Sequence, residues 1–305
     1  MDQHNFKIFV FYFLAAVITF SCAPKKFAAS EKQYNASLTA LKETISSKEP
    51  QTLTVLPNIE IPVDTLYTQQ LHTYKDTLFK MKTADLQNGI STQWISTVNF
   101  NLRKPNYVIL HHTAQDSLQQ TINTFTKTKT QVSAHYVIAE DGKVVQMLND
   151  YLRAWHAGNS SWGKNTDLNS CSIGIELDNN GTEPFSELQI NSLLALLTKL
   201  KKDYNIPQQN FIGHADIAPS RKKDPSALVP WKTLAEKGFG FWPDEFLMTA
   251  PSDFNPALGL RIIGYDIKNL PAAITAFKLH YMQNEVNAVL DPKTVNTIYS
   301  IYLQQ

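Results

Sequence analysis

Short apolar runs alternate with helical patterns beyond residue 100, and this alternation constrains the fold more than any other feature. The runs YVILH (107–111), CSIGIEL (171–177) and QNFIGH (209–214) are typical of short buried strands. An amphipathic pattern, SLQQTINTFTKT (117–128), follows the first run, and a longer one, FSELQINSLLALLTKLKKDY (185–204), precedes the last. Strands that alternate with helices indicate an α/β domain with a mixed central β-sheet flanked by helices.

Local turn and capping signals support these elements. Asp141-Gly142 lies between two strand-like runs and predicts a β-hairpin. Ser186 and Gln189 form a candidate capping box for the long helix. Asp291-Pro292 predicts an N-cap followed by proline at the first helical position, opening a last helix to about Leu303.

The pattern changes again at GFGFWPDEF (238–246), after which short helical segments such as PAAITAFKLHYM (271–282) follow. We therefore expect a small helical domain over residues 238–305. A unit of this size buries little surface by itself, so packing against the preceding domain would help to stabilise it.

The N-terminus carries a different signal. Ile8 to Phe20 is apolar except for Tyr12 and Thr19, which is too short for a comfortable membrane span and suits the apolar region of a signal peptide. Ser21 and Cys22 follow, and the segment resembles a bacterial lipoprotein signal peptide. We expect residues 1–21 to be the signal peptide and Cys22 to be lipidated. An ordinary signal peptide with an incidental cysteine is the alternative.

The composition of residues 22–95 and the net charge limit the kinds of partner that this protein can have. Residues 22–95 are rich in Ser, Thr, Gln and Lys and read as a tether with short helices. The formal net charge is +1, which gives no electrostatic footprint for nucleic acid, so we expect no nucleic-acid partner. The second cysteine, Cys171, is left without a disulfide partner if Cys22 carries acyl chains.

Two histidines end apolar strands. His111 closes YVIL and His214 closes FIG, and a histidine at such a place is held by rigid scaffold yet open to a cleft. Catalytic zinc sites use three protein ligands and leave a fourth position for water. The loop after His214 contains two acids, Asp216 and Asp224. From the residues alone, a solvated loop and a metal site both remain open, and so does the choice of acid.

Four motifs occur in order: NYVILHHTA, AWHAG, SIGIELDN and GHADIAPSRKKDP. Together they resemble the zinc-dependent N-acetylmuramoyl-L-alanine amidases of the amidase-2 class, which are related to peptidoglycan recognition proteins. The resemblance covers roughly residues 100–305. It implies an amidase catalytic domain over residues 96–237. The 238–305 segment is similar to the helical peptidoglycan-binding-type domain of lipoprotein members of the family.

The resemblance also assigns roles. It implies one Zn²⁺ held by His111, His214 and Asp224, with Glu176 as the catalytic general base and Lys222 stabilising the oxyanion. Asp216 is then a structural residue, and His112 is not a ligand. The substrate-binding residues that it implies are His156, Trp155, Trp162 and Arg221. Trp155 has a second interpretation as a core residue, and Arg221 one as a plain solvated side chain.

The activity implied is hydrolysis of the amide between N-acetylmuramic acid and L-alanine in peptidoglycan, EC 3.5.1.28, with the 1,6-anhydro form as an open alternative. A non-catalytic peptidoglycan receptor on the same fold is the competing hypothesis. Receptors of this kind tend to lose a zinc ligand or the catalytic glutamate. This chain keeps all of the implied ligands and catalytic residues, which are His111, His214, Asp224, Glu176 and Lys222. We expect a monomeric, periplasm-facing lipoprotein of the cell envelope, anchored in the outer membrane through Cys22.

Overall fold

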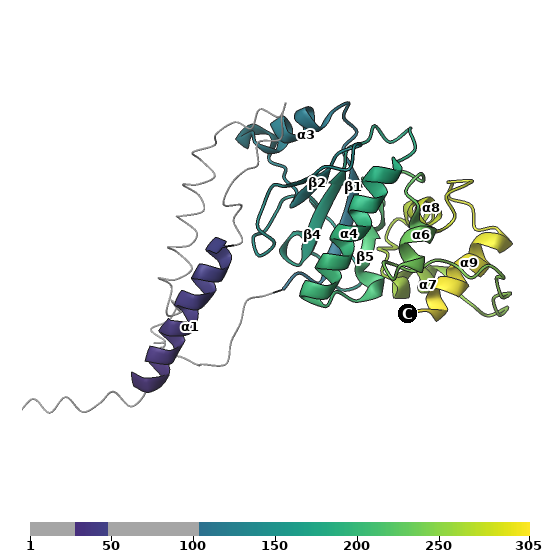
Figure 1. Ribbon diagram of the computed structural model, residues 1–305. Coiled ribbons are helices and arrows are strands. Elements are labelled where there is room, and N and C mark those ends of the chain that lie inside the picture. Colours follow the sequence, from purple (N-terminus) through teal and green to yellow (C-terminus); the bar gives the residue numbers. More distant parts are fainter. Residues whose placement is uncertain (1–27, 48–103) are drawn as a thin grey trace, which may run out of the picture.

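The computed structural model describes residues 28–47 and 104–305 (Figure 1). Its centre is a five-stranded sheet in the order β3-β2-β4-β1-β5. The strands are β1 Tyr107–His112, β2 Tyr136–Ile138, β3 Val144–Gln146, β4 Ser172–Leu177 and β5 Phe211–Gly213. β1, β2, β4 and β5 run parallel and β3 pairs antiparallel with β2, so the prediction of a mixed sheet is confirmed.

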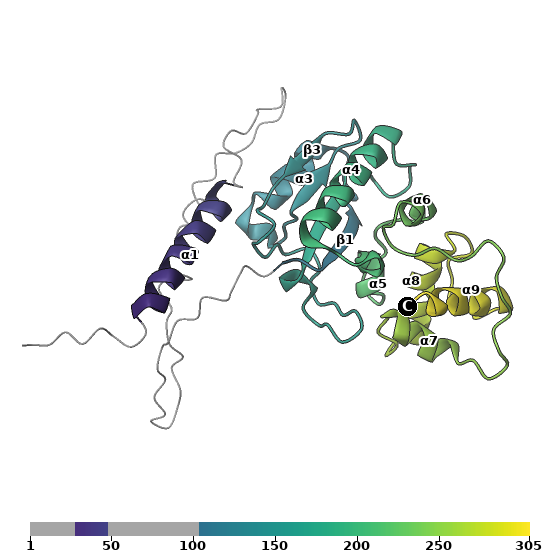
Figure 2. The same ribbon diagram turned by 60° about the horizontal axis from the view of Figure 1, so that its bottom comes forward.

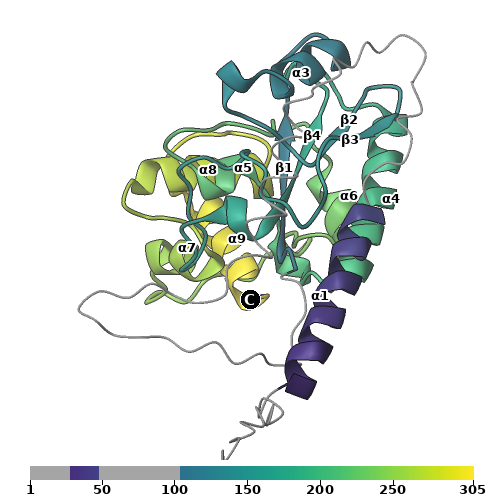
Figure 3. The ribbon, with the colours of Figure 1, turned by 90° about the vertical axis from the view of Figure 1, so that its left-hand side faces the viewer.

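Helices cover both faces of this sheet. The α-helices are α1 Ala28–Ser47, α3 Leu118–Phe125, α4 Glu187–Tyr204, α5 His214–Ile217, α6 Trp231–Glu236, α7 Pro256–Ile263, α8 Leu270–Tyr281 and α9 Pro292–Leu303. Short 3₁₀ helices lie at Thr128–Thr130, Leu168–Ser170 and Gln208–Asn210. Figure 3 shows α4 on one side of the strands and α5, α7, α8 and α9 on the other.

Side-chain alternation along β1 explains the two layers. Val108 and Leu110 belong to the hydrophobic cluster that includes Leu193 and Leu197 of α4. Ile109, which points the opposite way because strand side chains alternate, belongs to the second cluster. His111 follows with the same parity as Ile109, so it lies on the face opposite α4.

The hairpin and helix N-cap signals are confirmed, but the predicted capping box is only half formed. β2 and β3 form the hairpin around Gly142, whose φ of +84° is a conformation that favours glycine. The Ser186 side chain accepts from the backbone N–H of Gln189 and caps α4. The Gln189 side chain does not return to Ser186 and instead donates to the carbonyl oxygens of Ile138 and Asp178. The Asp291 carboxylate accepts from the N–H of Thr294 and caps α9, with Pro292 at the first helical position.

The C-terminal helices share their core with the sheet. Ile109 of β1, Ile212 of β5 and Ile217 of α5 form one cluster with residues of the three helices, among them Leu260, Phe277 and Ile298. Figure 2 shows α5 between the sheet and α8. The expected packing of the C-terminal segment on the sheet is therefore present, and its apolar contacts are part of the molecule's second core. The domain boundaries stay predictions.

The signal peptide, Cys22 and most of the 22–95 segment lie outside the described residues. In the parts of the chain that the structure does describe, no helix combines the length and the apolar character needed to cross a membrane.

Candidate metal centre and active site

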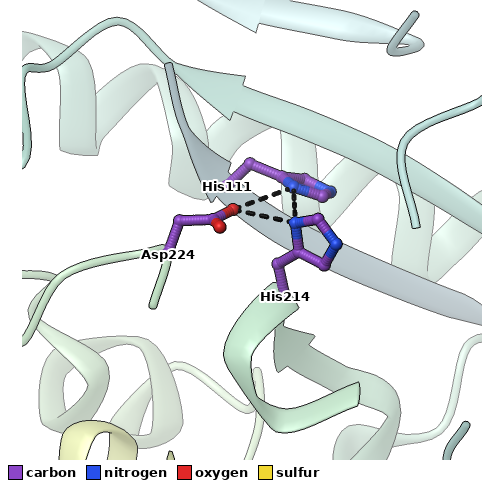
Figure 4. A group of neighbouring side chains, drawn as sticks. All are labelled: His111, His214 and Asp224. Atoms are coloured by element: carbon purple, nitrogen blue, oxygen red, sulfur yellow. Dashed lines mark hydrogen bonds and ion pairs between the residues drawn. The ribbon is translucent and has the colours of Figure 1, made fainter. Parts of the chain in front are cut away.

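Three side chains from distant parts of the sequence converge at the carboxyl edge of the sheet. The Nδ1 atoms of His111 and His214 lie 2.9 Å apart, and Oδ2 of Asp224 lies 3.2 Å from the first and 2.9 Å from the second. Figure 4 shows the three groups pointing at one another from a strand, the start of a short helix and a loop. Both histidines are buried and Asp224 is half-buried.

Parallel strand pairing brings these groups together. β1 pairs with both β4 and β5, so His111 near the end of β1 and His214 directly after β5 meet at one edge. The loop that follows α5 then returns Asp224 to the same point. The backbone N–H of Ala215 donates to the carbonyl of Asp224 at 2.7 Å, which fixes this return.

The donor set fits a metal cation. Nε2 of His214 lies 3.2 Å from the carbonyl oxygen of Ala157, which can accept a hydrogen bond from Nε2 and so leave Nδ1 to bind a cation. In that tautomer the Nδ1 lone pair points at the other two ligand atoms. Burial, followed by the neighbouring His214, lowers the pKa of His111 to about 4, so this imidazole is neutral at pH 7. Neutral imidazoles with a carboxylate are typical metal ligands.

Glu176 lies beside this group. It is the register partner of His111 in the β1–β4 pair, and its Oε1 lies 4.0 Å from Nδ1 of His111. Burial, and then the charge of Asp224, raises the pKa of Glu176 to about 8, against the opposing effect of Lys222. Its Oε2 is buried without a hydrogen-bond partner among the described residues. A carboxyl held in this way is suited to accept and release a proton.

Similarity to known proteins agrees with this geometry. Residues 101–227 match the Amidase_2 family, described as N-acetylmuramoyl-L-alanine amidase. The N-acetylmuramoyl-L-alanine amidase AmiD of Escherichia coli K12 is 34% identical over 219 residues, which cover 61% of this chain and 78% of AmiD. This chain belongs to the amidase-2 family. It is accordingly an N-acetylmuramoyl-L-alanine amidase, EC 3.5.1.28, and not a receptor without activity.

Two solved structures extend the likeness to the fold of the amidase. AmiD from E. coli in complex with anhydro-N-acetylmuramic acid-L-Ala-D-gamma-Glu-L-Lys superposes with a TM-score of 0.61 and 29% identity, over 71% of this chain and 95% of that one. AmpDh3 from Pseudomonas aeruginosa in complex with anhydromuramic pentapeptide has a TM-score of 0.61 at 26% identity, over 73% and 99%. Both matches extend well beyond the 101–227 segment, so they include C-terminal elements.

Two residues that were predicted to bind substrate are buried in the structure. Trp162 is 6% exposed and packs edge-on against Tyr265 at a centroid distance of 4.9 Å, inside the second core. His156 is 8% exposed and both of its ring nitrogens contact protein atoms, Nε2 of His111 and Oγ of Ser172. Protein atoms therefore contact both ring nitrogens of His156, and most of the Trp162 ring is covered; their roles towards substrate stay predictions.

Arg221 has contacts that the sequence did not suggest. Its Nη2 donates to the carbonyl oxygens of Ala157 and Asn159, at 2.8 and 3.0 Å. That nitrogen therefore holds the 157–159 segment and is not free for a peptide carboxylate. Trp155 is 51% exposed, which rules out its interpretation as a core residue, while its role towards substrate stays a prediction.

The contacts of Lys222, Asp216 and His112 are compatible with their assigned roles, which stay predictions. Lys222 is half-buried, and its charge acts on both Glu176 and His111. Asp216 is outside the ligand group and accepts from the N–H of Gly213, the hydroxyl of Tyr265 and Nδ1 of His280. His112 is no ligand, and its Nδ1 accepts from the N–H of Ser226.

Sequence reasoning missed the support beneath the 156–157 segment. The Oδ1 atom of Asn169 accepts from the backbone N–H groups of both His156 and Ala157, at 3.0 and 2.8 Å. Asn169 belongs to a 3₁₀ turn with no recognisable motif, so no local pattern predicted its contacts.

Proposed function

We propose that this amidase holds one Zn²⁺ between His111, His214 and Asp224 and uses Glu176 to move protons during hydrolysis of the bond between muramic acid and L-alanine. The convergence of two Nδ1 atoms and one carboxylate oxygen beside a buried, unpaired glutamate oxygen carries this proposal. Two imidazoles and one carboxylate form a three-ligand set of the kind found in catalytic zinc sites, which keep one position open.

When bound, the metal supplies an activated water and polarises the scissile carbonyl. The protein supplies the proton transfers. Glu176 accepts a proton from the attacking water and delivers it to the leaving nitrogen of L-alanine, as a general base and then a general acid. Its raised pKa supports the second half of this cycle, because a carboxyl of higher pKa holds the proton until the amine departs.

Lys222 supplies fixed positive charge near the reacting carbonyl. The charge of Lys222 opposes the rise in the pKa of Glu176, which supports a place for the ammonium group within electrostatic reach of the site. A cation at such a distance stabilises the negative charge that develops on the carbonyl oxygen. Lys223 is exposed, so a substitution there is the control for the same substitution at Lys222.

The substrate class is peptidoglycan fragments. We infer that 1,6-anhydro-muramoyl peptides are accepted, because the AmiD and AmpDh3 structures hold an anhydro-muramoyl peptide and an anhydromuramic pentapeptide. We assign substrate contact to the exposed aromatic side chain of Trp155. It precedes His156 and lies close in sequence to Ala157, whose carbonyl oxygen contacts Nε2 of His214.

We further propose that the chain acts as a monomer at the periplasmic side of the outer membrane, tethered through acylated Cys22. The N-terminal sequence pattern carries this proposal. Metabolic labelling with a radioactive fatty acid would test it, since Cys22→Ser removes the label if the assignment is right. Retained label on Cys22→Ser overturns it.

The decisive experiment is mass spectrometry of muropeptide digests with zinc-loaded protein, chelated protein and Glu176→Gln. Wild type should release free stem peptides, and both chelation and Glu176→Gln should abolish release. Glu176→Gln should still bind one zinc, measured by elemental analysis, and exposed Glu183→Gln is the matched control. Turnover by Glu176→Gln at the wild-type rate would falsify the assigned role.

A further inference from the structure

A chain of hydrogen bonds runs away from the metal centre behind His111. Nε2 of His111 lies 3.0 Å from Nδ1 of His156. Nε2 of His156 lies 3.1 Å from Oγ of Ser172, and that hydroxyl donates to the carbonyl oxygen of Leu168 at 2.5 Å. The chain therefore joins a predicted metal ligand to the backbone through two buried side chains.

The last hydrogen bond of this series fixes which atom donates in each of the others. The carbonyl of Leu168 can only accept, so the one proton of the Ser172 hydroxyl is used there. Oγ of Ser172 must then accept the Nε2–H of His156. A neutral imidazole has one N–H and one lone pair, so Nδ1 of His156 presents its lone pair to His111. His111 is left with its proton on Nε2 and its lone pair on Nδ1, the atom that faces His214 and Asp224.

We propose that His156 is a positioning residue that fixes the tautomer and ring orientation of His111, and so prepares its Nδ1 to bind the metal. This inference rests on the proposed metal centre. A hydrogen bond to the second nitrogen of a ligand histidine sets which nitrogen binds the metal and raises its basicity.

The place of the His156 ring is built into strand β4. A Cβ atom at Gly174 would lie 2.4 Å from Cγ of His156, so the ring occupies the space above this glycine. The backbone of His156 is held by Oδ1 of Asn169. Gly174 lies in the middle of an otherwise apolar buried strand, and its lack of a side chain makes room for the imidazole of His156.

The next residue acts on the other histidine ligand in the same way. The carbonyl of Ala157 accepts from Nε2 of His214, and Nη2 of Arg221 donates to the same oxygen. Adjacent residues of one segment therefore hold the Nε2 atoms of both ligand histidines. This arrangement leaves both Nδ1 atoms directed at a common point.

Zinc affinity of His156 variants, measured by competition with a chromophoric chelator, tests the proposal. His156→Leu removes the acceptor and should weaken zinc binding by about 10–100-fold, the usual cost of losing such a partner. His156→Asn places an amide oxygen near the position of Nδ1 and should recover most of the affinity. Asn210→Leu is the matched control, because Asn210 and His156 are both 8% exposed and the Asn210 side chain donates to the backbone carbonyl of Asn106, at the other end of β5 from His214.

A second readout needs no metal and no activity. Nitrogen-15 NMR of the metal-free wild type should show His111 as the Nε2–H tautomer, and His156→Leu should lose this preference. The proposal is overturned if wild-type His111 carries its proton on Nδ1, or if His156→Leu binds zinc within about threefold of wild type. It is equally overturned if Leu and Asn at position 156 weaken binding alike while Asn210→Leu does not. Wild type that binds no zinc at all contradicts the proposed function instead.

Discussion

Replacing Tyr265 with Phe tests whether the C-terminal helices support the helix that begins with His214. The hydroxyl of Tyr265 donates to Oδ1 of Asp216 at 2.5 Å, and both residues are almost fully buried. Asp216 lies two residues after His214 in α5, and Tyr265 lies just beyond α7. Their hydrogen bond therefore joins the helical segment to the element that carries a metal ligand.

The expected loss follows from the acceptor. A hydrogen bond to a charged group contributes about 1.5–3 kcal/mol, and its removal leaves a buried carboxylate oxygen short of a donor. For a domain of this size, that loss corresponds to a fall in Tm of about 3–12 °C. The ring itself keeps its packing against Trp162 in Tyr265→Phe, so only the hydroxyl is tested.

Urea denaturation of the metal-free protein, followed by tryptophan fluorescence, measures this change in the free energy of unfolding. Tyr302→Phe is the matched control, because Tyr302 is half-buried against the same cluster and its hydroxyl has no hydrogen bond within residues 104–305. The reasoning is refuted if Tyr265→Phe costs less than about 0.5 kcal/mol, the range of ordinary surface changes. Equal losses in the two variants would also refute it.

Three further outcomes are expected. Burial raises the pKa of Tyr136 and Tyr204. The stability that they contribute is therefore intact below about pH 10, where an unfolded tyrosine ionises, and falls above it. Ultraviolet absorbance and circular dichroism should show these two residues ionising only as the protein unfolds, and their ionisation in the folded protein would contradict this. Trp155→Ala should raise the KM for muropeptides and change the free energy of unfolding by less than about 0.5 kcal/mol, since the side chain is half exposed; an unchanged KM argues against substrate contact. Zinc at about a thousandfold excess over its Kd should stabilise the wild type by about 4 kcal/mol, and His111→Ala should lose most of this increment in thermal melts; equal stabilisation of both proteins would mean that the ion binds elsewhere.

The sequence predicted what depends on local pattern. Strand runs ending in His111 and His214, the Ser186 cap and the hairpin at Gly142 follow from side-chain periodicity and turn chemistry, and each is present. The choice of Asp224 over Asp216 came from family resemblance. Spacing alone was insufficient, because the loop after α5 returns through backbone contacts that no periodic pattern encodes.

The burial of two residues predicted to bind substrate has one physical cause. Trp162 packs against Tyr265, about a hundred residues later in the chain, and His156 contacts His111 and Ser172 from separate strands. Both residues are aromatic and lie in a loop-like segment, which favoured substrate contact as the interpretation. Their burial depends on packing between residues far apart in the chain, and this packing cannot be read directly from a single sequence.

The parity of strand β1 connects these observations. Ile109 and His111 share one face of the sheet, and the C-terminal helices cover Ile109 while the metal group forms around His111. Gly174 and Glu176 share the matching face of β4, where the first seats the ring of His156 and the second faces the metal group. One sheet face therefore carries the core shared with the C-terminal helices, the seat of His156, which we propose orients a ligand, and Glu176, which we propose transfers protons. Removing residues 238–305 would uncover that core directly beneath the metal centre, so the amidase site and the C-terminal helices depend on a common folded unit.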